Sequence, residues 1–212
     1  MLVVRSVVVC LLAIPAAAQY TLESAGPCAA EGLADAVKAG LENGGHRVKD
    51  ATGAVIVEVW LRKAIPTEKS AEAPRGSDFA MVPQGGLAGV IRYAKNGGDF
   101  RGQPIAAGVY TMRFGLQPED GNHQGASPRR DHLLLAPAAS DKDPASQPGI
   151  DELVDMSRKA SGTVHPSVLF LSAPPAGAKF PGLHQTAAHH QVLLVKSGSL
   201  ELGITVVGKA EE

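Results

Sequence analysis

Apolar and polar residues alternate along much of the chain after residue 53, and this period of two is typical of strands with one buried face. Val55, Val57, Val59 and Leu61, for example, fall on one face of a single segment. The unbroken run 133–135 predicts a strand that is buried on both faces. The predicted strands are 46–49, 54–63, 87–93, 109–116, 131–136, 167–172, 191–196 and 200–207, with turns at 50–53 and 197–199.

Two segments instead carry the spacing of helices. Leu33, Val37 and Leu41 recur four residues apart, which predicts a helix over 29–42. A second helix is predicted over 150–160, with acidic residues early and basic residues late. Many short strands and only two helices indicate a mainly β fold, and we expect an antiparallel β-sandwich with two short peripheral helices.

The first 18 residues have the order of a secretory signal peptide: Arg5, an apolar stretch over 7–14, and alanines at 16–18. The apolar stretch is too short to span a bilayer. We therefore expect an exported protein, periplasmic or extracellular, with no membrane span after signal removal. Residues 19–212 are then expected to form a single β-sandwich domain.

Composition narrows the possible partners. The chain has 20 Lys and Arg against 21 Asp and Glu, with no basic stripe, which argues against a nucleic-acid partner. Cys10 lies in the predicted signal, so Cys28 is alone in the exported part and cannot form an internal disulfide. We interpret Cys28 as a small buried apolar residue, and expect packing to supply the stability.

Residues 100–111 end in Gly108-Val109-Tyr110-Thr111, and this segment resembles the entry to a strand in many exported β-sandwich proteins. At such a corner the Tyr110 ring packs inward and its hydroxyl can bond to the backbone. The longer segment 108–137, with 157–162 and 206–209, is similar to an uncharacterised exported bacterial β-sandwich family. That resemblance covers most of the exported part; the family has no assigned activity, so it implies fold and export alone.

The richest polar segment is the loop 118–132, which contains Asp120, His123, Asp131 and His132. A carboxylate with two imidazoles is a plausible ligand set for zinc or copper, with Asp120, His123 and His132 converging. The favoured alternative is ordinary turn chemistry, because Asp and Asn around a glycine bond to their own backbone. The remaining histidines are expected to be scattered over the surface: His46, His165, His184, His189 and His190.

Other catalytic patterns are missing from the sequence. It has no Gly-x-Ser-x-Gly, no phosphate-binding glycine loop and no dinucleotide fingerprint. Trp60 beside Glu58 and Arg62 suggests a sugar platform, but a half-buried tryptophan in a sheet is the favoured interpretation. An enzyme would need a deep pocket near a Glu or His with a perturbed pKa.

We therefore expect a non-catalytic binding or structural module that takes an unknown small molecule or protein and needs no cofactor. A zinc or copper protein is the alternative, and a hydrolase comes third.

Overall fold

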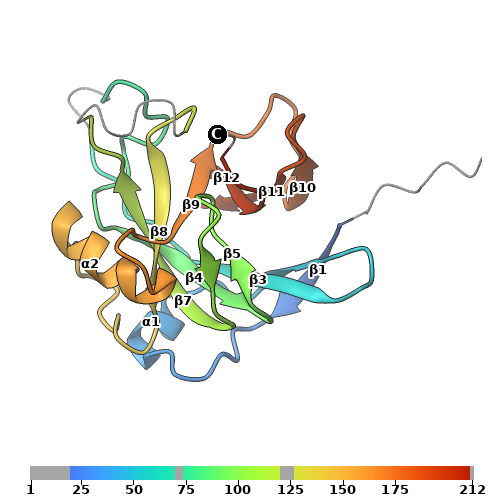
Figure 1. The fold of residues 1–212 in the computed structure, drawn as a ribbon, viewed down its shortest axis with the longest axis horizontal. Helices are drawn as coiled ribbons and strands as arrows, with labels where there is room; N and C mark the ends of the chain where they lie inside the picture. The colour runs from blue at the N-terminus through green and yellow to red at the C-terminus, as the bar shows by residue number, and fades with distance from the viewer. Residues whose placement is uncertain (1–19, 70–73, 120–126, 211–212) are drawn as a thin grey trace, which may run out of the picture.

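The computed structural model describes residues 20–69, 74–119 and 127–210, and its fold is mainly β (Figure 1). Ten strands form one continuous sheet in which every paired neighbour is antiparallel. In spatial order they are β1 (Thr21–Gly26), β2 (Gly45–Lys49), β3 (Val55–Leu61), β4 (Leu87–Tyr93), β7 (Gly108–Leu116), β8 (Asp131–Pro137), β9 (Val168–Ser172), β12 (Leu200–Val207), β11 (Gln191–Ser197) and β10 (Gly182–Gln185).

The sheet curls until its two edge strands approach each other. In Figure 1 the strands run round from β10 and β11, through β9 and β8, to β4, β3 and β1. Cα atoms of β1 and β10 come within 8 Å, although no ladder joins these strands. We call this line of approach the seam. The predicted mainly β, antiparallel class is confirmed, but a two-layer sandwich is not, because one nearly barrel-shaped sheet connects all ten strands.

The predicted helices are both present, with one much shorter than expected. α2 (Ile150–Ser161) matches its prediction to within one residue. α1 (Asp35–Ala39) has only five residues, since Gly32 has a φ of 75° and Ala34 is extended. Leu33, Val37 and Leu41 are nevertheless all buried, so the spacing located the apolar face correctly. A two-stranded hairpin, β5 (Gly97–Gly98) with β6 (Pro104–Ile105), was not predicted.

Side chains fill the inside of the curled sheet. Alternate residues of the strands point inward, as Val57, Val59 and Leu61 do on β3. Inward residues of β7, β8, β11 and β12 join them in one cluster of aliphatic and aromatic side chains. The interior is therefore a packed core.

The outer face of the sheet is covered in two places. Around α1, the residues Val37 and Leu41 pack with Trp60, Val90 and the buried Cys28. Around α2, Leu153 packs with Leu134, Phe170 and their neighbours. Leu134 faces outward while both of its neighbours on β8 face inward, and all three are buried. This confirms the prediction that β8 is covered on both faces.

The corner before β7 has the predicted geometry. The Tyr110 side chain is buried and its hydroxyl donates a hydrogen bond to the carbonyl of Ala106 at 2.9 Å. The Tyr93 ring meets it edge to face, with the ring centroids 6.1 Å apart. Both contacts fix the entry of the chain into β7.

Candidate functional site

The predicted metal loop is only partly described by the structure. Asp120 and His123 lie outside the described residues, whereas Asp131 and His132 begin strand β8. Because neighbouring residues of a strand point to opposite faces, these last two side chains have different surroundings.

Asp131 is fully buried and holds a turn against the sheet. Its carboxylate accepts a hydrogen bond from the Ser77 hydroxyl at 2.6 Å and another from the Asp78 amide at 2.7 Å. The His132 ring lies 5.8 Å from the Phe170 ring, and its Nδ1 is 3.0 Å from the carbonyl of Arg130. The structure does not bring Asp131 and His132 together.

Within residues 20–69, 74–119 and 127–210, no group of three His, Cys, Asp or Glu side chains could hold a metal ion. The zinc or copper hypothesis therefore depends on Asp120 and His123 and stays a prediction. Elemental analysis of the purified protein, with His123→Ala as the comparison, tests it.

The Trp60 and Glu58 side chains are both covered, so they do not form a sugar platform. Trp60 is 3 % exposed and its indole N–H donates to the carbonyl of Gly26 at 2.8 Å. Glu58 accepts hydrogen bonds from Arg47 and Arg92, which stand beside it on β2 and β4. Burial alone would raise the pKa of Glu58, but the hydrogen bonds and charges of both arginines lower it overall. This cluster stabilises the sheet.

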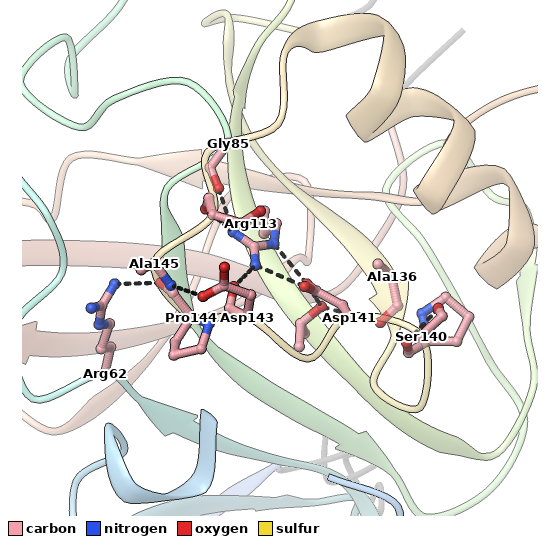
Figure 2. A network of polar contacts seen from close by, with 12 residues as sticks. Arg62, Gly85, Arg113, Ala136, Ser140, Asp141, Asp143, Pro144 and Ala145 are labelled. Carbon is pink, nitrogen blue, oxygen red and sulfur yellow. Dashed lines mark hydrogen bonds and ion pairs between the residues drawn. The ribbon is translucent and has the colours of Figure 1, made fainter. Parts of the chain in front are cut away.

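A second charged cluster, the Arg113 network, lies on the outer face of β7 (Figure 2). Arg113 is fully buried and forms a two-pronged ion pair with Asp141, at 2.6 and 2.7 Å. Its remaining N–H groups donate to the carbonyls of Gly85, Ser146 and Asp143. All donors of the guanidinium are used, so this network fixes the loop after β8 against the sheet.

A pocket opens at the seam, and we call it the seam pocket. Its volume is about 420 Å³. Its lining comes from β1, from the start of β2 and the segment before it, and from the residue before β10: Leu22, Glu23, Ser24, Glu42, Gly44, Gly45, His46 and Pro181. The seam pocket therefore lies where β1 and β10 approach each other without pairing.

The register of β1 with β2, together with the segment before β2, places the polar groups of the seam pocket. Ser24 of β1 and His46 of β2 are direct cross-strand partners, so their side chains share one face. Glu42 comes just before β2, and its amide donates to the carbonyl of Leu61 at 2.9 Å.

The glycines at 44 and 45 follow Glu42, and a Cβ on Gly45 would lie 2.2 Å from the Trp60 indole nitrogen. Gly45 thus permits the close packing of β2 against Trp60.

Two titratable side chains of the seam pocket, Glu42 and His46, lack a partner in the described part of the chain. Among the described residues, no donor or cation pairs with the Glu42 carboxylate, and no hydrogen bond reaches the His46 ring. Burial raises the pKa of Glu42 and lowers the pKa of His46. Glu23 differs from Glu42, because Lys49 binds its carboxylate at 2.7 Å.

These groups can accept hydrogen bonds, attract a cation and exchange protons. Ser24 adds a hydroxyl, which accepts a long hydrogen bond of 3.4 Å from the Gly26 amide. Sequence reasoning missed this site, because its residues come from separate segments that only the folded sheet brings together. The one available signal was His46 beside Gly44-Gly45, which resembles an ordinary surface turn.

No protein-family model, curated protein or solved structure matches this chain. The resemblance to an exported bacterial family accordingly stays a prediction. Of the helices in the described ranges, none has the length and apolarity needed to cross a membrane.

Proposed function

We propose that this protein is an exported, non-catalytic binding module whose ligand occupies the seam pocket. One observation carries the proposal: Glu42 and His46 line the same pocket and neither side chain has a partner within the described residues. Both side chains are only partly buried, so they are open to a ligand that enters the pocket.

The size and composition of the seam pocket support a small ligand. Its volume of about 420 Å³ lies in the range of small-molecule sites, roughly 300–1,000 Å³. Leu22 and Pro181 provide apolar surface, while Ser24, Glu42 and His46 provide polar groups to orient the ligand. This lining is more polar than that of most small-molecule sites, which favours a polar ligand.

The test uses a variant that fills the seam pocket. Gly44 lines the pocket and does not need a positive φ. A Cβ at this position meets nothing within 4 Å, so Gly44→Phe is chosen to add bulk here. Gly149→Phe is the matched control, since Gly149 has the same freedom at the start of α2. Both variants are screened with wild type against a library of small polar molecules, by thermal shift and by fluorescence.

Trp60 is the only tryptophan of the chain and packs against Gly45 in the pocket wall, so its emission reports on the site. We expect ligands that bind wild type and the Gly149 variant and fail to bind Gly44→Phe. A screen without hits, or with hits that Gly44→Phe still binds, would contradict the proposal.

Export is the second part of the proposal, and residues 1–18 support it. Expressed with these residues in a bacterial host, the protein should leave the cytoplasm and begin at Gln19. N-terminal sequencing of the exported fraction tests this, and a chain that keeps Met1 in the cytoplasm would rule it out.

A hydrolase is a second candidate, and one observation favours it: Ser24, His46 and Glu42, the residue types of a nucleophile, base and orienting acid, line one pocket. We rank it lower because no hydrogen bond connects the three within the described residues. A fluorophosphonate probe followed by intact mass measurement tests this candidate. Labelling that Ser24→Ala abolishes and Ser199→Ala leaves intact would favour the hydrolase over the binding module.

A further inference from the structure

We infer that the seam pocket recognises a small organic cation, an alkylammonium group, through the carboxylate of Glu42. This inference rests on the proposed function, since it names the ligand class of the same pocket.

The charge balance of the seam pocket is negative. Glu23 and Glu42 are its acidic lining residues. Glu23 points to the opposite strand face from Ser24 and is neutralised by Lys49 at 2.7 Å, which leaves Glu42 as the acidic group of the pocket. Glu42 has no such partner, and none of the described lining residues is Lys or Arg. A bound cation would form an ion pair with the Glu42 carboxylate.

His46 does not replace that missing cation at neutral pH. Its partial burial lowers the pKa, so the neutral imidazole prevails. A neutral ring keeps one nitrogen free to accept a hydrogen bond, and an ammonium group has three N–H donors. Glu42 and His46 can therefore each offer an acceptor to an ammonium group in the seam pocket.

The walls of the pocket favour an organic cation over a metal ion. Leu22 and Pro181 offer apolar contact for an alkyl chain. A metal ion would need several close ligands, and the described residues contain no such group. The best fit is a small molecule with one amine on a short aliphatic chain.

Three probes of equal length and different charge test the inference: n-butylammonium, n-butanol and butyrate. Each is titrated into wild type, Glu42→Gln and Glu31→Gln at neutral pH, with Trp60 emission and calorimetry as readouts. Glu42→Gln removes the charge and keeps the shape. Glu31→Gln is the control, because Glu31 is exposed and does not line the pocket.

We expect n-butylammonium to bind wild type and Glu31→Gln more tightly than either other probe. Loss of the charged hydrogen bond in Glu42→Gln should weaken its binding about tenfold. Equal binding of all three probes, or no change in Glu42→Gln, would overturn the inference.

The two proposals fail in distinguishable ways. If neutral or anionic molecules bind wild type and not Gly44→Phe, the pocket is a binding site and the cation inference alone is wrong. If n-butylammonium and every library molecule leave the seam pocket empty, both proposals are wrong.

Discussion

The Arg113 network and the seam pocket both contain charged side chains next to the sheet, but the two regions differ in how fully those side chains are paired. Arg113 is 0 % exposed, and all its donors reach Asp141 or backbone carbonyls (Figure 2). Glu42 and His46 are only partly buried, and neither has a partner among the described residues. Full pairing is what a structural role requires, whereas groups left unpaired at a pocket are available to a ligand.

The largest expected effect comes from breaking the Arg113 network. Arg113→Ala leaves the Asp141 carboxylate buried without its counterion, and such losses cost about 3–5 kcal/mol of folding stability. Urea unfolding measures the change in the free energy of unfolding. Arg101→Ala, which removes an exposed arginine, should stay within about 0.5 kcal/mol. A loss below about 1 kcal/mol for Arg113→Ala would remove the contrast between the two regions.

A smaller effect separates two neighbouring glycines of the seam pocket. In Gly45→Ala the new Cβ collides with the Trp60 indole, so we expect a loss of about 1–3 kcal/mol and a shift in Trp60 emission. Gly44→Ala meets open space and should change stability by less than about 0.5 kcal/mol. Equal losses in the two variants would show that Gly45 does not support the pocket wall.

The smallest effect concerns the pH dependence of stability. Because burial lowers the pKa of His46 in the folded protein, the unfolded chain takes up a proton first as the pH falls below about 6.5. Stability is therefore lost between that value and the lower folded pKa. His46→Gln should remove this loss, while His184→Gln, which changes an exposed histidine outside the pocket, should preserve it. Urea midpoints at pH 7 and pH 5 measure the difference.

Glu42 acts in the opposite direction and at lower pH. Its folded pKa is raised, so the folded protein binds the proton more readily, and stability is gained as the pH falls through that range. Glu42→Gln should abolish this gain, with Glu31→Gln as its control. If neither His46 nor Glu42 alters the pH profile, burial does not perturb them and the comparison with the Arg113 network weakens.

The sequence predicted the strands well because alternation records which side of a sheet is buried. Leu87–Tyr93 and Leu200–Val207 have the predicted bounds. β1 and β10 were missed, because edge strands bury little and their alternation is weak. α1 was predicted too long, since apolar spacing fixes which residues are buried without fixing the backbone between them.

The candidate site was much harder to predict. Ser24, Glu42 and His46 carry no motif. A cross-strand register pairs Ser24 with His46, and Glu42 joins them from the segment before β2. The fully buried pairing of Arg113 with Asp141 joins a strand to a loop 28 residues away, which no periodicity reveals. A metal site was predicted in the loop 118–132 because its polar residues are close in sequence. In the structure the Asp131 carboxylate accepts hydrogen bonds from Ser77 and Asp78 in a buried turn.

The approach of β1 to β10 has a consequence for self-association. An unpaired edge strand is a template on which another molecule can continue the sheet, and proteins with such edges risk aggregation. Here each edge strand lies beside the other, and β10 has only four residues. Each edge strand therefore shields the other. Conditions that separate β1 from β10 would expose both edge strands together to pairing with other molecules.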